Sequence, residues 1–119
     1  MNENRLSEFG AYQKARALFE LVADDMEQLI GNPLCTRLVS QQMASADSIC
    51  ANMEEGYGRE SSREYRHYLI IARGSTRETQ GRYSRLARWL TPEHVAPKIA
   101  LCEEISKILS ATIVRLGRE

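Results

Sequence analysis

The stretch from Ser61 to Leu90, SSREYRHYLIIARGSTRETQGRYSRLARWL, decides the fold, because it lacks proline and repeats its apolar residues with helical period. Ser61 followed by Glu64 forms a capping box, which marks a helix N-terminus. The stretch therefore predicts a helix over residues 62–90, about 40 Å long at roughly 1.5 Å per residue. Its expected core sector holds Tyr65, Tyr68, Leu69, Ala72, Thr76, Thr79, Tyr83, Leu86 and Leu90.

Two further helical segments precede this one and another follows it. Residues 8–31 show helical spacing with Ser7 as the expected N-cap, and residues 33–57 follow Asn32 as cap and Pro33 in the first turn. Pro97 would remove a backbone hydrogen bond inside a helix, so we expect a turn at 92–96 and a last helix at 97–116. Short connections between four such segments predict an all-α, antiparallel up-down-up-down four-helix bundle, with residues 1–119 as a single domain.

The other three segments also have expected core faces, and the second has an expected end. Gly56 and Gly58 flank the end of the second segment, where we expect a glycine in the left-handed conformation. The expected core residues are Phe9, Tyr12, Phe19, Val22, Met26 and Leu29 in the first segment, Leu34, Leu38, Ala46, Ile49 and Met53 in the second, and Leu101, Cys102, Ile105, Ile108, Leu109, Thr112, Ile113 and Leu116 in the last.

The composition is that of an ordinary globular domain. The chain has 119 residues, 43% hydrophobic and 27% charged, a balance that argues against disorder. It shows no apolar run of the kind that a secretory signal or a membrane span needs. Cys35, Cys50 and Cys102 are odd in number and lack a C-x-x-C pair, which favours buried free thiols in a reducing compartment. We expect a soluble, cytoplasmic protein without a membrane partner.

The net charge of zero hides an asymmetry along the chain. Residues 1–58 hold four basic and nine acidic side chains, a net charge of −5, whereas residues 59–90 hold eight arginines and three glutamates, a net charge of +5. Residues 91–119 balance at four of each sign. Such a separation of charge indicates that these regions attract partners of opposite charge, which can be neighbouring helices, other copies of the chain or nucleic acid.

Opposite the core sector of the 62–90 helix lies a line of guanidinium groups, here called the arginine stripe. It can be a solvated face, a surface that docks on the acidic surface of another copy, or a phosphate-binding surface. The absence of a positive excess and of interleaved aromatic residues weighs against nucleic acid. The stripe comprises Arg59, Arg63, Arg66, Arg73, Arg77 and Arg88, of which Arg63, Arg66, Arg73 and Arg77 are the candidate nucleic-acid contacts.

Between the core sector and the stripe runs a mixed band of small, polar and apolar residues. Gly74 costs helix stability, about 1 kcal/mol relative to alanine, but small residues allow another helix to approach closely. A helix with two apolar faces often has two partners, one inside its domain and one outside. Alternatively, Trp89 only covers the end of the bundle. The mixed band, a candidate interface between copies, consists of Ile71, Gly74, Ser75, Glu78, Arg82 and Trp89.

The sequence gives no support for catalysis. Glu64-x-x-His67 is half of a di-iron carboxylate site, but His94 has Thr91 three residues before it, and the site needs the motif twice. Phosphate-binding loops, dinucleotide fingerprints and nucleophile elbows are also missing. We therefore expect a protein that is not an enzyme and that needs no metal or cofactor.

The stretch from Ser48 to Arg59, SICANMEEGYGR, resembles a known family. It is similar to the four-helix-bundle proteins encoded in intervening sequences of bacterial large-subunit ribosomal RNA genes. The similarity continues in SREY (62–65), LIIARGS (69–75) and YQKA (12–15), and spans nearly the whole chain. The resemblance implies a homopentameric ring of antiparallel bundles with no enzymatic activity. Related bundles are accessory proteins to the reverse transcriptases of diversity-generating retroelements and bind nucleic acid.

This chain departs from the family pattern in the second helix. Met43 and Ala44 stand where many members carry two basic residues, and Asp47 and Cys50 replace an apolar residue and a proline. These departures weaken the case for nucleic acid or a reverse transcriptase as partner. We interpret the motif as structural, with Asn52 and Glu55 binding the loop 58–62 or pairing with Arg59 or Arg63, and ligand binding is the alternative. Its residues are Asn52, Glu55, Gly56, Tyr57, Gly58 and Arg59.

Overall fold

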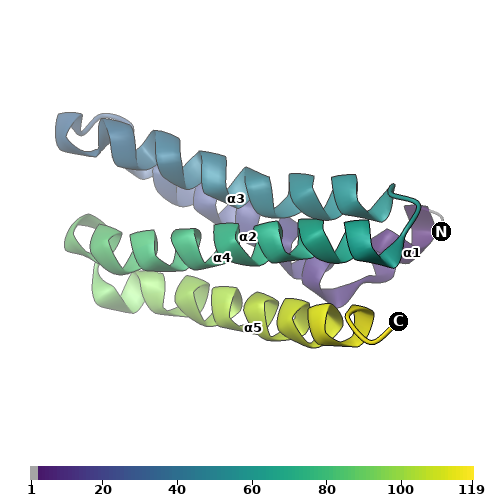
Figure 1. The fold of residues 1–119 in the computed structure, drawn as a ribbon. Coiled ribbons are helices and arrows are strands. Elements are labelled where there is room, and N and C mark those ends of the chain that lie inside the picture. The colour runs from purple at the N-terminus through teal and green to yellow at the C-terminus, as the bar shows by residue number, and fades with distance from the viewer. Residues whose placement is uncertain (1–2) are drawn as a thin grey trace.

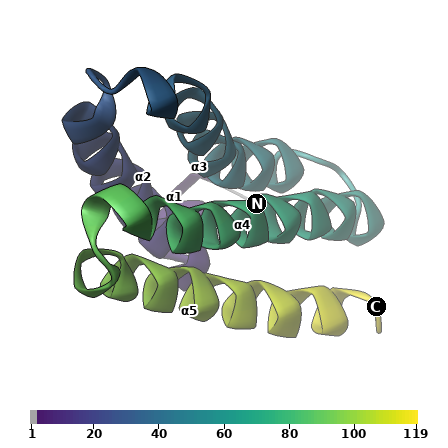
Figure 2. The same cartoon turned by 90° about the vertical axis from the view of Figure 1, so that its left-hand side faces the viewer.

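The computed structural model describes residues 3–119, with side chains from Leu6 onward, and this part of the chain is helical without strands. The α-helices are α1 (Glu3–Glu8), α2 (Gly10–Leu29), α3 (Thr36–Tyr57), α4 (Ser62–Leu90) and α5 (Pro92–Leu116), and a 3-10 turn, η1 (Pro33–Cys35), precedes α3. Figure 1 shows the four long helices side by side, with the α3–α4 loop at one end. The α2–α3 and α4–α5 turns lie together at the other end (Figure 2).

The four long helices form an elongated body of 46 × 21 × 20 Å around one core. α4 packs mainly against α3 on one side and α5 on the other, and α2 completes the arrangement by contacting α3 and α5. None of the helices among residues 3–119 combines the length and apolarity that a membrane crossing requires. The all-α prediction is confirmed.

The bounds predicted for α4 are confirmed, because local signals fix them. Ser61 has extended backbone and its side chain accepts a hydrogen bond from the Glu64 backbone N–H at 3.2 Å, as a capping box requires. Asn32 likewise accepts from the Leu34 N–H at 3.0 Å, with Pro33 next to it, although the turn that it begins is 3-10 before it becomes α-helical.

The predicted start of the last helix is wrong. α5 begins at Pro92, directly after Thr91. The Thr91 hydroxyl accepts a hydrogen bond from the His94 N–H at 3.3 Å, and the Thr91 N–H donates to the Ala87 carbonyl at the end of α4. Thr91 has a φ of 73°, an unusual backbone conformation for a β-branched residue. Pro97 lies within α5 on an exposed side, so solvent can reach the carbonyl that loses its partner.

Two other local predictions are wrong. Ser7 does not cap α2, because the chain breaks between α1 and α2 at Phe9, which offers no side-chain cap. No glycine in residues 3–119 has positive φ, and Gly58 closes α3 at φ −80°. Gly56 is needed for another reason. A Cβ there would lie 2.6 Å from the Cβ of Tyr68, so the lack of a side chain at Gly56 allows α3 and α4 to approach closely.

The core agrees with the predicted faces apart from a few positions. Leu34 is 78% exposed at the α2–α3 turn, not buried. Seven other residues of the predicted core are only half-buried: Phe9, Tyr12, Phe19, Leu38, Tyr68, Leu101 and Ile108. The inward face of α2 is instead made by Ala11, Ala15, Leu18, Val22, Asp25, Met26 and Leu29. All three cysteines are buried free thiols, and burial raises the pKa of Cys50 to about 11 and of Cys102 to about 12.

Candidate interaction surfaces

The mixed band of α4 lies along α3 and is divided between interior and surface. Ser75 and Arg82 are buried, whereas Ile71 is 38% exposed and Glu78 is exposed. A Cβ added at Gly74 would find no atom within 4 Å, so this position offers open space beside the helix. The exposed part of the mixed band is therefore narrower than the helical spacing of the sequence predicted.

Trp89 belongs to the core more than to the surface. Its side chain is half-buried and packs against the hydrophobic core, with the Arg88 guanidinium 5.9 Å from the centre of its ring. This contact fits the alternative in which Trp89 covers the end of the core. A substitution at Trp89 would therefore disturb the packing at this end of the core.

The interface between α3 and α4 is hydrogen-bonded through small polar side chains. The hydroxyls of Ser45 and Thr79 are 2.7 Å apart, and those of Ser48 and Ser75 are 2.9 Å apart. Gln42 is fully buried and donates to the Thr79 carbonyl at 3.0 Å. Short side chains of this kind keep the helices close and leave a shallow depression above them.

That depression, here called the serine groove, contains a buried arginine. One terminal nitrogen of the Arg82 guanidinium donates to Gln42 Oε1 at 2.9 Å and to Ser45 Oγ at 3.0 Å, while its Nε has no partner. Desolvation lowers the pKa of Arg82 because burial disfavours the charged form. The groove has a volume of about 330 Å³ and is lined by Gln41, Ala44, Ser45, Ser48, Ser75, Glu78 and Arg82.

A second groove, the acidic groove, lies between α2 and α3. It holds about 200 Å³ and is lined by Arg16, Phe19, Glu20, Asp47, Cys50 and Glu54. Tyr12 donates to Glu54 at 2.6 Å, and Arg16 in turn donates to the Tyr12 hydroxyl at 3.3 Å. The net negative charge of the first half of the chain thus reaches the surface on a face adjacent to the serine groove, since the two grooves share α3.

The α4 part of the arginine stripe lies on the side of α4 that faces α5, and part of it is structural, whereas Arg59 is wrongly assigned to the stripe because it pairs with Glu55 at the end of α3. Arg66 donates through Nε to the Ile113 carbonyl at 3.0 Å, and Arg73 donates to the Ser110 hydroxyl at 3.1 Å. Arg63 and Arg77 are exposed and form no ion pair with residues 6–119. The stripe therefore offers fewer free cations than its sequence suggests.

The motif from Asn52 to Arg59 forms the end of the α3–α4 interface. Asn52 bonds back to the Ser48 carbonyl and hydroxyl at 2.8 and 2.9 Å, so the predicted contact with the loop is wrong for this residue. Glu55 pairs with Arg59 one turn later, as expected. Tyr57 places its ring edge-on to Tyr65, with ring centres 5.9 Å apart.

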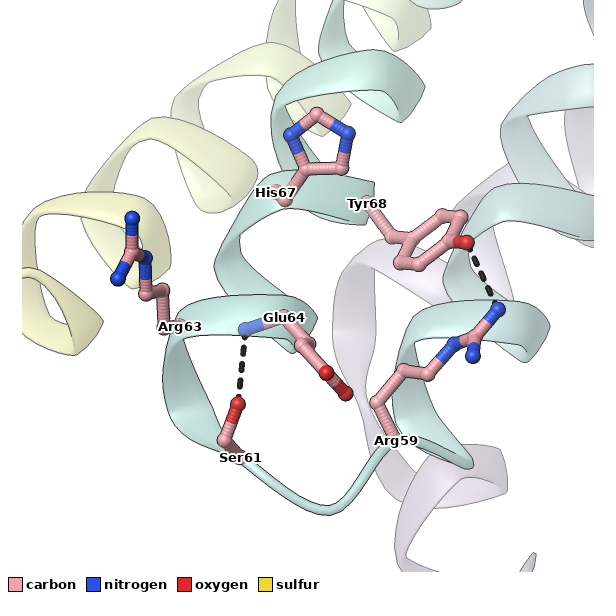
Figure 3. A pocket seen from close by; sticks show the side chains of 6 residues that line it. All are labelled: Arg59, Ser61, Arg63, Glu64, His67 and Tyr68. Atoms are coloured by element: carbon pink, nitrogen blue, oxygen red, sulfur yellow. Dashed lines mark hydrogen bonds between the residues drawn. The ribbon is translucent and has the colours of Figure 1, made fainter.

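Arg59 also donates to the Tyr68 hydroxyl at 2.8 Å, and Figure 3 shows these side chains around a surface depression. The depression has a volume of about 490 Å³ and is lined by Arg59, Ser61, Arg63, Glu64, His67 and Tyr68. Glu64 and His67 are exposed there and point away from the core. No group of three histidine, cysteine or acidic side chains among residues 6–119 is arranged to hold a metal.

Comparison with protein families identifies the chain. The family model of 23S rRNA-intervening sequence proteins matches residues 7–111. The chain belongs to this family. Similarity to the family therefore extends from α1 almost to the end of α5, and the predicted resemblance is confirmed.

A solved structure supports the fold. The chain is similar to a crystal structure of a protein with unknown function from the S23 ribosomal protein family of Bacteroides thetaiotaomicron, with 23% identity and a TM-score of 0.81. The similarity covers 87% of this chain and 97% of that one. A comparison with curated proteins gives no match.

Sequence reasoning missed one buried group, the Asp25 cluster, which joins α2, α4 and α5. Asp25 is 2% exposed and accepts from the Tyr83 hydroxyl at 2.8 Å, while Lys98 Nζ lies 3.4 Å from the same carboxylate. His94 Nε2 is 2.6 Å from the other carboxylate oxygen and 3.0 Å from Lys98 Nζ. The shorter contact needs a proton, so His94 donates to Asp25 and Lys98 bonds instead to the His94 carbonyl at 3.2 Å.

The cluster had a signal in the sequence. Asp25 lies between Val22 and Met26 on the apolar stripe of α2, where an acid must find partners. Its partners come from 58 and 69 residues away in the chain, and the spacing within one helix does not reveal them.

Proposed function

We propose that this chain is a non-enzymatic assembly and binding module, an antiparallel up-down-up-down four-helix bundle that forms a closed homo-oligomeric ring. Five copies follow from the family resemblance described above. The observation that carries the proposal is the pair of unlike grooves on adjacent faces, one acidic between α2 and α3, the other containing Arg82 between α3 and α4.

An odd-numbered ring needs head-to-tail contacts in which two different patches meet. Adjacent faces of a four-helix bundle differ in direction by about 90°, and a regular pentagon of parallel bundles needs about 108°. Contacts between opposite faces would instead build an open filament. The sharing of α3 by both grooves supports closure at about four or five copies.

Apolar and small residues beside the serine groove supply the main attraction. Ile71 is 38% exposed and Gly74 leaves open space, so a neighbouring helix could approach α4 here. Charge contributes less, because exposed ion pairs contribute about 0–1 kcal/mol each and salt screens them. The proposal therefore predicts a ring that tolerates moderate salt.

Light scattering coupled to gel filtration tests the proposal. We expect the unmodified protein to elute as a closed oligomer at micromolar concentration, and Ile71→Arg or Gly74→Phe to reduce its mass severalfold. Val114→Arg on α5 is the control, because Val114 is 53% exposed but lies outside both grooves. A monomer for the unmodified protein would refute the assembly.

The runner-up is nucleic-acid binding, alone or as an accessory protein to a reverse transcriptase, which the exposed guanidinium groups of Arg63 and Arg77 favour. Removing one arginine that binds a phosphate should flatten the dependence of log K on log salt by about one unit. Arg63→Gln with Arg77→Gln should then reduce RNA binding and the slope together. Tight RNA binding by the unmodified protein at physiological salt would promote this function over assembly.

A further inference from the structure

Arg82 is buried without an ion-pair partner, and the nearby Glu78 carboxylate acts on its charge only from a distance. The residue is only 9% exposed, and its hydrogen bonds go to the neutral oxygens of Gln41, Gln42 and Ser45. No carboxylate of residues 6–119 forms an ion pair with it. An uncompensated buried charge is costly, and proteins normally pair such groups.

The serine groove provides the space for a missing anion. Arg82 lines it together with Ser48 and Ser75, whose hydroxyls lie at the α3–α4 contact. A guanidinium presents a rigid fork of donors that matches the two oxygens of a carboxylate or phosphate. Neutral hydroxyls beside it can add hydrogen bonds without adding charge.

Glu78 is the acid within the chain that competes for this position. It lies one turn before Arg82 on α4 and also lines the groove, yet the two side chains are not ion-paired. If Glu78 were the counter-ion, its removal would leave the Arg82 charge unpaired and would weaken, not strengthen, the ability of the groove to hold Arg82 in place. If the groove takes an external anion, removal of Glu78 should help that anion to bind.

We infer that the serine groove binds one oxyanion group, a carboxylate or a phosphate, through the guanidinium of Arg82. The group can belong to a free small anion or to an acidic side chain of a neighbouring copy, such as those of the acidic groove. The second source rests on the assembly proposed above, whereas the first does not.

The test is a titration of inorganic phosphate into the full chain at constant ionic strength, followed by NMR of the arginine Nε–H signals. We expect a saturable shift of the Arg82 signal, its loss in Arg82→Gln, and phosphate binding about tenfold weaker in Arg82→Lys, which keeps the charge but not the fork. Glu78→Gln should tighten phosphate binding by up to about fivefold. Arg77→Gln, on the α5 side of α4, should leave it unchanged.

Light scattering of the same samples separates the two sources. A phosphate shift at constant mass supports a free anion and stands even if the protein is monomeric. A loss of mass on adding phosphate, reproduced by Arg82→Gln but not by Arg77→Gln, supports the carboxylate of a neighbouring copy. The inference is overturned if phosphate leaves both the Arg82 signal and the mass unchanged, or if Glu78→Gln weakens phosphate binding instead of tightening it.

Discussion

Asp25 and Arg82 are both buried charges, but the two regions around them balance charge differently. Asp25 accepts from Tyr83 and His94 and lies 3.4 Å from the Lys98 ammonium, so three helices close around a neutralised carboxylate. Arg82 donates only to neutral oxygens at the edge of a groove. The first arrangement is complete within one chain, whereas the second lacks an ion pair and leaves the groove open for the oxyanion inferred above.

The largest effect should come from removing the centre of the closed region. Asp25→Ala leaves the Lys98 ammonium buried without an anion and the Tyr83 hydroxyl without an acceptor, so we expect a loss of about 3–5 kcal/mol in the free energy of unfolding. Urea denaturation followed by circular dichroism measures it. The exposed neighbour Asp24→Ala is the control and should change stability by less than about 0.5 kcal/mol.

Gly56 and Gly74 lie at two places on the α3–α4 interface that differ in packing, the tight contact with Tyr68 and the side of the serine groove. Gly56→Ala would place a Cβ 2.6 Å from that of Tyr68, so we expect a loss of about 1–3 kcal/mol from overpacking. Gly74→Ala meets no atom within 4 Å and should instead stabilise the helix by about 0.5–1 kcal/mol. Equal effects of the two substitutions in thermal unfolding would contradict this difference in packing.

Alkaline pH should weaken the closed region through buried acids that resist ionisation. Burial and the nearby Asp25 raise the pKa of Tyr83, and burial raises that of Cys102 from 9.0 to about 12. The folded chain therefore holds protons that the unfolded chain releases, so stability is complete below pH 9 and falls as pH rises towards 12. Each group makes the free energy of unfolding fall by about 1.4 kcal/mol per pH unit over the range where only the unfolded chain ionises. Cys102→Ala should therefore reduce the fall in the free energy of unfolding, measured by urea denaturation between pH 9 and 11, by this amount per pH unit.

The smallest effect should come from the open region. Arg82→Met replaces an uncompensated buried cation with an apolar side chain of similar length, and Gln42 keeps its bond to the Thr79 carbonyl. We expect the free energy of unfolding to change by no more than about 1 kcal/mol in either direction. A loss as large as that of Asp25→Ala would show that the two regions are balanced alike and would remove the basis for an external anion.

The sequence predicted best the features that depend on neighbours along the chain. The bounds of α4 follow from Ser61 and Glu64, whose cap is local, and the buried cysteines follow from their positions on apolar faces. The Asp25 cluster depends on contacts across 58 and 69 residues, so only the misplaced acid was visible in advance.

The candidate surfaces were predicted less well because they depend on how the helices sit against one another. The helical spacing identified the mixed band as a separate face of α4, but α3 covers Ser75 and Arg82, and the spacing within one helix does not give the position of a second helix. Likewise, α5 engages Arg66 and Arg73 of the arginine stripe through its carbonyl and hydroxyl oxygens. The residue pattern of one helix thus distinguishes its faces, but it does not show which face packs against another helix.

The single-residue connection at Thr91 bears on the order in which the chain folds. Because Thr91 ends α4 and caps α5, the two longest helices can meet after almost no loop has been closed, and loop closure is the main entropic cost of early contacts. We expect the α4–α5 hairpin to form first and to serve as the template on which α3 and then α2 dock. Substitutions in the α4–α5 contact would then slow folding, whereas those at the acidic groove would chiefly speed unfolding.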